Sequence, residues 1–300
     1  MILDKCNAKR GKLMIACQTL EGLPAEIVYQ TFMDAFSDYH VKIEMTAQEF
    51  DRANIRRGYS PEYSAAAFFE GRCVGILMKG LRLSDGHLTA YDMGTGVIPA
   101  FRQSGVTTRM MNFVREKMDA GNVTQYVLEV IQDNEPALNF YRKQKFEIAR
   151  EFCCYRASRL NFSSKNNHRV ERIRQPDWTL FRSFWDFAPS WQNSEDSVNA
   201  IGDHFRYYAA FDHAEIAGYL IADVQSGEIV QFAVRKDVRN KGFGTELFRA
   251  EGREIQSEYS SILNVEAGKT ETQIFLASLG FVCTFRQYEM IRTLRRAVIA

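Results

Sequence analysis

Two stretches of the sequence combine an arginine and a glycine at the same spacing, in a pattern that could bind phosphate. They are residues 97–107 (VIPAFRQSGVT) and residues 234–244 (VRKDVRNKGFG). Each string reads valine, four residues, arginine, two residues, glycine. A strand that ends in such a string and turns directly into a helix exposes backbone N–H groups at the positive end of the helix dipole. Because glycine has no β-carbon to hold a ligand away from the main chain, these turns could bind a phosphate or pyrophosphate.

The two strings belong to a larger internal repeat. Val97, Arg102 and Gly105 each have a counterpart 137 positions later, and the two arginines add positive charge beside each turn. Downstream, residues 140–146 resemble residues 275–281 at an offset of 135. A single glycine at a helix start could equally serve only the turn of the chain. Two ordered matches, however, predict a duplicated fold.

Hydrophobic periodicity predicts the same order of elements in both halves. In the first half we expect helices at 24–38 and 47–57, strands at 65–69, 73–78 and 88–97 with a hairpin turn at 70–72, a helix from 106 to a cap at 121, a strand at 126–131, a helix from 136 and a strand from 146. In the second half we expect helices near 177–187 and 194–202, strands at 205–211, 215–222 and 228–235, a helix at 242–257, a strand at 261–265, a helix at 270–279 and terminal strands. Each half is therefore predicted to be α+β with a mixed sheet that places its Arg-Gly string between a strand and a helix.

Length and turn composition predict two domains. A chain of 300 residues is long enough for about two average domains. Residues 161–168 (NFSSKNNH) form the most polar and turn-rich interior stretch, close to the midpoint. We therefore expect one domain over residues 1–162 and a second over residues 163–300.

Composition excludes several classes of protein. Lys and Arg number 38 against 37 Asp and Glu, so the formal charge of +1 argues against a nucleic-acid-binding protein. With 46% hydrophobic residues the chain can bury a core, unlike a disordered protein. No apolar run is long enough to span a membrane, and Asp4 interrupts any signal-peptide-like start. We expect a cytoplasmic protein.

Cysteine and histidine spacing gives no sign of a metal site or a disulfide framework. The six cysteines include no C-x-x-C pair, and the five histidines include no H-x-x-x-H pair. Cys153 and Cys154 are neighbours, and adjacent residues of a strand point to opposite faces. We interpret both as packing residues and expect no bound metal.

Taken together, these motifs resemble those of the GNAT acyltransferase superfamily, twice over. The matching parts are residues 97–99, 102–107, 128–130 and the run Asn134-x-x-Ala137-x-x-x-Tyr141 with Phe146 in the first half, and residues 234, 239–244, 263–265 and 275–281 in the second. The resemblance covers most of both halves. It implies two tandem GNAT-like domains, each with a mixed, mostly antiparallel sheet flanked by helices. It also implies that the donor substrate acetyl-CoA lies between two splayed strands, with its pyrophosphate on the N–H groups of the turn.

The resemblance implies a donor-binding residue set in each half. In the first half the set is Val97, Ile98, Arg102, Gln103, Ser104, Gly105, Val106, Thr107, Asn134 and Ala137, and in the second half it is Arg239, Lys241, Gly242, Gly244 and Thr245.

Four positions depart from the family pattern. Thr107 stands where the family prefers glycine or alanine, and Lys145 replaces a glycine, although Thr107 can still donate its main-chain N–H. In the second half, Leu276 occupies the position of Tyr141, and Lys269 that of Asn134. A leucine cannot donate a proton. We therefore expect the first half to have kept the chemistry and the second half to have kept cofactor binding or packing alone.

The resemblance also implies roles in catalysis, each with a plainer alternative. Tyr141, a phenol with an ordinary pKa near 10, would protonate the departing thiolate, or it is a buried helix tyrosine. Asp92 stands where the family often has a base acting on the amine, or it fixes a turn or pairs with an arginine. Asn134 would bind the pantetheine arm or cap its helix. Glu129 and Glu228 are further carboxylates for which a solvent-facing or structural role is equally open.

The second half also concentrates the aromatic residues. All three tryptophans lie there, at positions 178, 185 and 191, among Phe181, Phe184 and Phe187. They could line an acceptor pocket, but their helical spacing favours a core.

The resemblance implies an enzyme that transfers an acetyl group from acetyl-CoA to a primary amine of a small molecule or peptide, by direct attack in a ternary complex. The alternative is a non-catalytic acyl-CoA-binding or scaffolding protein. Besides acetyl-CoA and an amine acceptor, we expect no nucleic-acid or membrane partner, and a monomer or a homodimer.

Overall fold

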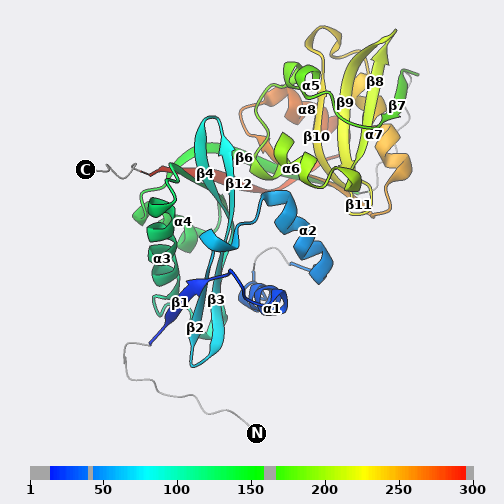
Figure 1. The fold of residues 1–300 in the computed structure, drawn as a ribbon. Coiled ribbons are helices and arrows are strands. Elements are labelled where there is room, and N and C mark those ends of the chain that lie inside the picture. Colours follow the sequence, from blue (N-terminus) through cyan, green and yellow to red (C-terminus); the bar gives the residue numbers. More distant parts are fainter. Residues whose placement is uncertain (1–13, 40–42, 159–166, 295–300) are drawn as a thin grey trace. The chain divides into compact units, whose positions relative to one another are not determined.

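The computed structural model describes residues 14–39, 43–158 and 167–294, which fall into two compact units (Figure 1). Of the described residues, the first unit contains those up to Asn54, then Gly58–Tyr126, and finally residues 293 and 294. The second unit contains Ile55–Arg57 and Val127–Arg292. The expected domain boundary, between residues 162 and 163, lies outside the described residues.

The first unit is an antiparallel sheet with helices on both faces. Its strands β1 (Ala16–Thr19), β2 (Ala65–Phe69), β3 (Arg72–Ser84) and β4 (His87–Val97) pair in sequence order. Its helices are α1 (Ala25–Ala35), α2 (Ala47–Arg57, whose last turn belongs to the second unit) and α3 (Val106–Ala120). The turn expected at 70–72 is a two-residue hairpin, with positive φ at both Glu70 and Gly71.

Glycines on the sheet of the first unit allow α1 and α3 to approach its two faces. A β-carbon at Gly96 would lie 2.8 Å from Ala35 of α1. A β-carbon at Gly75, on the opposite face, would lie 3.1 Å from Met110 of α3. Both helices therefore pack directly on the strands that carry the first Arg-Gly string.

The second unit has a larger mixed sheet. Its strands are β5 (Gln125–Ile131), β6 (Glu147–Ser158), β7 (Arg169–Ile173), β8 (Arg206–Asp212), β9 (Glu215–Asp223), β10 (Glu228–Val234), β11 (Tyr259–Glu266) and β12 (Val282–Thr293). The first two residues of β5 belong to the first unit. The order of the strands in the sheet is β5-β12-β6-β11-β10-β9-β8-β7. Its helices are α4 (Glu135–Lys143), α5 (Trp178–Phe184), α6 (Glu195–Ala200), α7 (Phe243–Glu254) and α8 (Thr270–Ser278). Strands β10 and β11 run parallel but pair only at Glu228 and Ser261, so they diverge beyond that point.

The structure confirms the predicted α+β fold and its duplication. β4 has a bulge at Met93 and β10 has one at Val230, at the same offset that separates the two Arg-Gly strings. Each string then forms a short 3₁₀ turn, η2 (Pro99–Phe101) or η5 (Lys236–Val238), and enters a long helix. The repeat in the sequence is therefore a repeat in the backbone.

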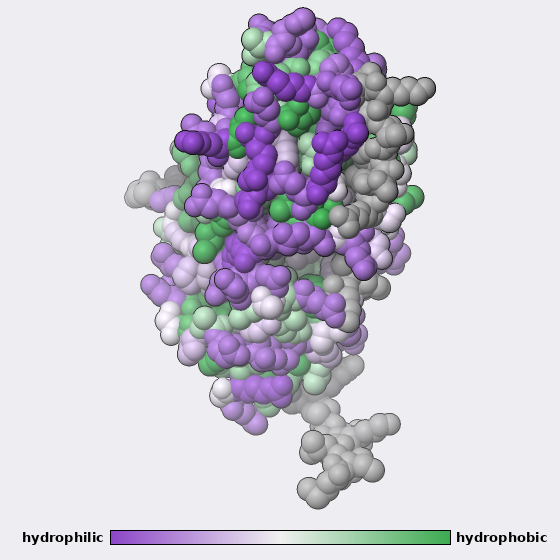
Figure 2. Space-filling model, turned by 90° about the vertical axis from the view of Figure 1, so that its right-hand side faces the viewer, coloured by the Kyte–Doolittle hydropathy of each residue, from purple (hydrophilic) through white to green (hydrophobic). Residues whose placement is uncertain are grey.

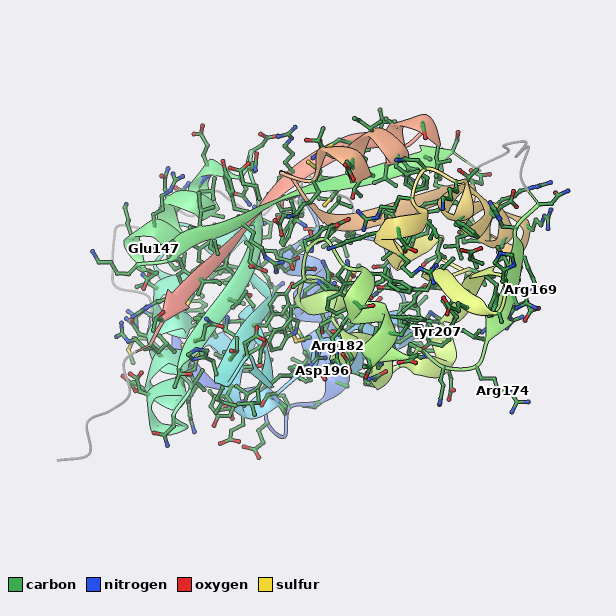
Figure 3. All side chains as sticks on the ribbon, turned by 90° about the horizontal axis from the view of Figure 1, so that it is seen from above. Glu147, Arg169, Arg174, Arg182, Asp196 and Tyr207 are labelled. Carbon is green, nitrogen blue, oxygen red and sulfur yellow. The ribbon has the colours of Figure 1, made fainter. Side chains whose placement is uncertain are left out.

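The expectations differed from the structure mainly at edges and ends. Strand β1 and the charged edge strand β7 were not expected, because neither has a clear apolar alternation. Figure 3 labels Arg169 and Arg174 near the two ends of β7, and the Arg169 guanidinium lies 4.2 Å from the centre of the Phe211 ring on the neighbouring strand β8. Charged side chains along an edge strand discourage its pairing with another chain. The terminal strands expected after residue 280 are the single strand β12.

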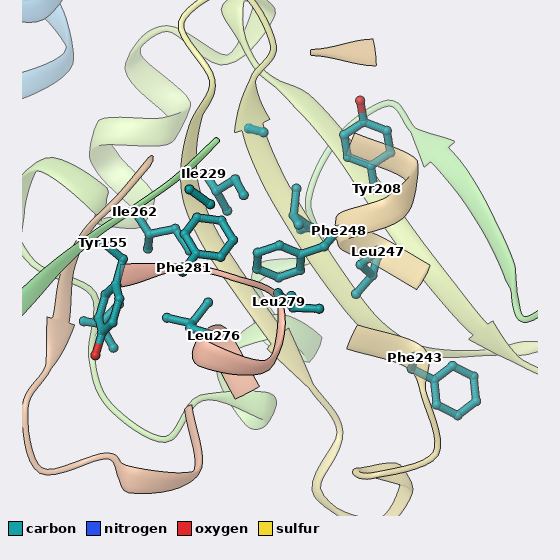
Figure 4. Packing of buried hydrophobic residues seen from close by; sticks show 14 of the residues in the cluster. Tyr155, Tyr208, Ile229, Phe243, Leu247, Phe248, Ile262, Leu276, Leu279 and Phe281 are labelled. Carbon is teal, nitrogen blue, oxygen red and sulfur yellow. The ribbon is translucent and has the colours of Figure 1, made fainter. Parts of the chain in front are cut away.

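Apolar side chains from α7 and α8 build the main core of the second unit (Figure 4). Phe248 and Leu247 of α7 meet Leu276 and Leu279, and this cluster covers strands β6 and β8–β11. A second cluster contains Phe181 and Phe184 of α5, with Trp178 and Trp185 packed against it. Cys153 and Cys154 are free and buried, as expected of packing residues.

The surface is mostly hydrophilic on the face shown in Figure 2, where apolar side chains lie in small separate groups. In the described parts of the chain, no helix is long and apolar enough to cross a membrane.

A buried carboxyl group in α7 predicts a pH-dependent stability. Glu251 has no exposed surface, and burial raises its pKa to about 7, although the Ser260 hydroxyl lowers it. The folded chain therefore holds a proton that the unfolded chain loses near its ordinary pKa of 4.5. Stability should fall as pH rises from 4.5 to 7, by about 3 kcal/mol in total.

We therefore expect Glu251→Gln to raise the urea-unfolding midpoint at pH 8 and to leave it nearly unchanged at pH 5. Glu258→Gln, at an exposed site near the same helix, is the matched control and should change neither value. Equal midpoints of wild type and Glu251→Gln at pH 8 would contradict this account.

Candidate functional site

Both Arg-Gly strings form the same backbone turn, which ends in a glycine at a helix N-terminus. Gly105 (φ 82°) precedes α3 and Gly242 (φ 97°) precedes α7, and both have left-handed conformations that favour glycine. The N-cap of each helix is this glycine, and among the described residues no side-chain cap hydrogen bond is made there. The first-turn N–H groups have no acceptor within the helix, so each turn offers main-chain donors to an anion.

Arg102 braces the first turn rather than presenting a free charge. Its Nε donates to the carbonyl of Val97 at 3.1 Å, and its Nη2 donates to the carbonyl of Ala35 at 3.0 Å. The guanidinium also pairs with Asp38, at 2.6 Å. The charge expected beside the turn is therefore largely compensated by a carboxylate.

Arg239 makes the same contacts in the second turn. Its Nε donates to the carbonyl of Val234 at 3.1 Å, and its Nη2 donates to the carbonyl of Phe184 at 3.2 Å. Asp186 pairs with this guanidinium at 2.9 Å. The spacing of valine, arginine and glycine in each string is thus explained by a bracing contact from the arginine back to the end of the strand.

A cavity of about 590 Å³ opens beside the Gly242 turn in the second unit. It is lined by the turn, by the diverging strands β10 and β11, and by α8. Four of the five donor-binding residues expected in this half line it: Arg239, Gly242, Gly244 and Thr245. Lys241 instead has its carbonyl 2.7 Å from Nε2 of His168.

Gly244 is required by packing in the wall of this cavity. A β-carbon there would lie 2.9 Å from the ring of Phe275 in α8. Leu276, the counterpart of Tyr141, faces the other way and is buried in the core with α7 (Figure 4). Helix α8 therefore presents the ring of Phe275 to the cavity. This residue directly precedes Leu276, which stands where the first half has the phenol of Tyr141.

A polar chain crosses the end of the cavity where β10 and β11 separate. The Tyr219 hydroxyl donates to Oε1 of Gln231 at 2.9 Å, and Trp185 Nε1 donates to that hydroxyl at 2.6 Å. Gln231 donates to the carbonyl of Asn193 at 2.6 Å, and the Asn193 amide donates to the carbonyl of Leu263 at 3.0 Å. The sequence analysis did not identify Tyr219, Gln231 or Asn193, although a glutamine within the apolar run of β10 was a visible signal. Trp185 both packs on the core and lines the cavity.

In the first unit, the expected donor-binding residues form the turn and the strand that leads into it. Val97 and Ile98 are buried at the end of β4, and Val106 is buried at the start of α3. Gln103, with φ 59°, and Gly105 are exposed. Ser104 and Thr107 are half-buried. The turn thus has a buried apolar base and an accessible main chain.

Asn134 and Tyr141 lie at the two ends of α4, in the second unit. Asn134 caps this helix, since its side chain accepts the N–H of Ala137 at 3.2 Å. Tyr141 is half-buried, with its ring centroid 5.5 Å from that of Phe140 and 5.6 Å from that of Phe146. Their contacts with a donor held at Gly105 stay predictions.

Asp92 is the acceptor of a hydrogen-bonded group in β4. Its carboxylate accepts the main-chain N–H of Gly94 at 3.0 Å, the hydroxyl of Tyr126 at 3.0 Å and the hydroxyl of Thr95 at 2.9 Å. Its ion-pair partner is a lysine, Lys79, at 3.0 Å. The sequence left open a pairing of Asp92 with an arginine, and the cation that pairs with it is instead this lysine.

The two other candidate carboxylates are also engaged. Glu129 accepts the side-chain amides of Gln192 and Asn264 at 3.0 and 2.8 Å. Glu228 forms a two-pronged ion pair with Arg56, at 2.7 and 2.9 Å. Burial alone would raise the pKa of Glu228, but the Arg56 guanidinium holds it below its usual value.

No cluster of three or more His, Cys, Asp or Glu side chains suited to a metal ion occurs within residues 14–39, 43–158 and 167–294.

Family models match both halves of the chain. The model of the acetyltransferase (GNAT) family matches residues 26–146, and that of the acetyltransferase (GNAT) domain matches residues 186–291. No curated protein matches the chain.

Several solved structures have a similar fold. A tandem GNAT protein from the clavulanic acid biosynthesis pathway aligns with a TM-score of 0.69 and 16% identity, over 93% of this chain and 98% of that one. A GCN5-related N-acetyltransferase from Sphaerobacter thermophilus aligns with a TM-score of 0.66 and 13% identity, over 94% of this chain and 96% of that one. A glucosamine N-acetyltransferase region of a fungal multi-domain β-N-acetylglucosaminidase aligns with a TM-score of 0.70 and 13% identity, over 94% of this chain and 38% of that one. At these identities the similarity establishes the fold alone.

Proposed function

This chain belongs to the GNAT acetyltransferase superfamily as a tandem member, and we propose from that premise that it transfers an acetyl group from acetyl-CoA to a primary amine. The amine attacks the thioester directly while both substrates are bound. The acceptor is a small molecule or a peptide, and the proposed location is the cytoplasm.

The observation that supports this proposal most strongly is the cavity that opens on the Gly242 turn. The turn beside it combines a left-handed glycine with the first-turn N–H groups of α7, and such main-chain donors suit a pyrophosphate. Its walls are two diverging strands, whose unpaired main-chain groups suit the amides of a pantetheine arm. The Gly105 turn repeats the same backbone, so we assign a donor-binding turn to each half.

We assign the chemistry to the first half. The amine must lose a proton and the departing thiolate must gain one. Tyr141 is the proposed acid, because a phenol can hydrogen-bond the sulfur and release its proton as charge develops there. Leu276, at the same place in the second half, has no such proton and is buried in the core.

Asp92 is the proposed acceptor of the amine proton, directly or through a water. The Thr95 hydroxyl lies within 3.0 Å of both carboxylate oxygens but has one proton to donate. When that hydroxyl turns away, a lone pair of Asp92 becomes available to a water or to the amine. The other donors, Gly94, Tyr126 and Lys79, keep the carboxylate in place.

The second candidate function is acyl-CoA binding without transfer. The burial of Leu276 and the polar chain across the cavity of the second unit favour this role for residues 163–300. Under this second candidate neither proposed domain, residues 1–162 or residues 163–300, transfers an acyl group, and the chain binds an acyl-CoA or acts as a scaffold.

The test uses the full chain, acetyl-CoA and a panel of primary amines. We expect acetyl-CoA to bind and to release free CoA thiol at a rate that depends on one or more of the amines. Acetyl-CoA binding without amine-dependent thiol release across the panel would favour the second candidate. No binding of acetyl-CoA would contradict both.

A further inference from the structure

Lys79 of β3 is a lysine buried within the sheet of the first unit. Its side chain has no exposed surface. The ammonium nitrogen lies 3.0 Å from Oδ2 of Asp92 and 4.0 Å from the centre of the Tyr126 ring. The main chain of Lys79 is fixed as well, because its N–H donates to the Ser64 hydroxyl at 2.9 Å and its carbonyl accepts from Ser60 at 2.8 Å.

Fold stability alone does not explain this ion pair. Lysine is almost never fully buried. When two charges are removed from water, the free energy of hydration that they lose is about as large as the free energy that their attraction gains. Replacement of both partners of such a pair by apolar residues is often neutral or stabilising. A sequence under selection for stability alone has no need of Lys79 and Asp92.

The second half of the chain serves as an internal comparison. Lys79 pairs with Asp92 at the edge of the β4 bulge, and Ala222 pairs with Ile229 at the edge of the β10 bulge. Ala222 and Ile229 are both fully buried. The duplicated fold therefore forms the same bulge with an apolar pair, and the ion pair occurs in the half to which we assign the chemistry.

We propose that Lys79 is a positioning residue for acyl transfer, which holds the Asp92 carboxylate in place at the bulge of β4. This inference rests on the proposed function of the first half. Lys79 has no exposed surface and touches no substrate. It acts through the carboxylate, which can then take the proton of the amine.

The arrangement predicts an effect of pH. In the described structure, Lys79 contacts the charged or titratable groups of Asp92 on β4 and Tyr126 on β5. Burial lowers the pKa of Lys79 to about 8, although Asp92 raises it. Above that pH the ammonium loses its proton and Asp92 retains only neutral donors. The kcat should therefore fall above about pH 8, whereas deprotonation of an amine substrate would raise the rate over the same range.

The test compares Lys79→Met and Lys79→Arg in the full chain, with Lys117→Met as the matched control at an exposed lysine of α3. At pH 7 we expect Lys79→Met to lower kcat about 10-fold or more, with the KM for acetyl-CoA within about 2-fold of wild type. Lys79→Arg should restore most of kcat and remove the fall above pH 8, because arginine keeps its proton. Lys117→Met should match wild type. Thermal melting of each variant shows whether it is folded.

Each outcome has a defined meaning. A folded Lys79→Met protein with wild-type kcat, or an alkaline fall that persists in Lys79→Arg, would overturn the positioning role while leaving the proposed function intact. If Lys79→Met fails to fold, the pH profile of Lys79→Arg against wild type still decides the question. Absence of amine-dependent turnover in wild type would instead reject the proposed function, and this inference with it.

Discussion

Tyr141→Phe is expected to lower the kcat of acetyl transfer by about 100-fold, with little change in the affinity for acetyl-CoA. The substitution removes the phenolic proton and leaves the ring, so the contacts with Phe140 and Phe146 persist. Stopped reactions that measure free CoA thiol at saturating amine would give kcat, and equilibrium titration would give the affinity.

The defect should also depend on the leaving group. A thioester whose thiol has a lower pKa needs less help from an acid, so the ratio of wild-type to Tyr141→Phe rates should shrink with such a donor. Tyr288→Phe removes a phenol from β12 and is the matched control, expected to behave as wild type. Equal kcat values for Tyr141→Phe and wild type, with a confirmed acceptor, would show that Tyr141 is not the acid.

Gly242→Ala is expected to weaken acetyl-CoA binding at the second-half cavity by about 10-fold or more. A β-carbon there must occupy a left-handed backbone position at φ 97°, beside the N–H groups that would contact the pyrophosphate. Calorimetric titration of the full chain should show loss of one class of acetyl-CoA site.

A matched control separates backbone strain from lost binding. Gly280 also has a left-handed conformation, at φ 86°, but a β-carbon there would meet no atom within 4 Å. Gly280→Ala should therefore carry a similar conformational cost and retain both classes of site. If Gly242→Ala binds acetyl-CoA with wild-type affinity and stoichiometry, the cavity is not a donor site.

The sequence was sufficient to predict the turns, because their requirements are local. A valine and a glycine at fixed spacing specify the end of a strand and a left-handed helix start. Both copies formed as expected, with Gly105 and Gly242 at the helix N-termini. The duplication was also visible in the sequence, as a constant offset between the two strings. The structure confirms it, because the bulges of β4 and β10 are separated by the same offset.

The ion pairs that compensate the charges of Arg102 and Arg239 are contacts between residues far apart in the sequence, which the spacing of residues within each string does not reveal. Arg102 pairs with Asp38 and Arg239 pairs with Asp186, and each aspartate follows the C-terminal end of a helix far away in the sequence. Likewise the buried partner of Asp92 is Lys79, a residue at which the sequence suggested that the strand stops. β3 continues to Ser84, where it still pairs with β4, and within this ladder the lysine contacts a carboxylate on the neighbouring strand.

The cavity was the least predictable feature. Its polar end combines Asn193, Tyr219, Gln231 and Leu263, which come from separate elements and have no common motif. The strand β12, which lies between β5 and β6 in the sheet order, shows the same limit. Strand order follows from which edges meet in three dimensions, and periodicity contains no information on that choice.

Hydrogen exchange at the two helix starts, with and without acetyl-CoA, tests the donor-binding account most directly. Saturating acetyl-CoA should slow amide exchange in residues 242–246 and 105–109, because the first-turn N–H groups would then donate to a pyrophosphate. Unchanged exchange in both segments, at a concentration where calorimetry shows the ligand bound, would mean that the nucleotide lies elsewhere and that the glycine turns serve the chain alone.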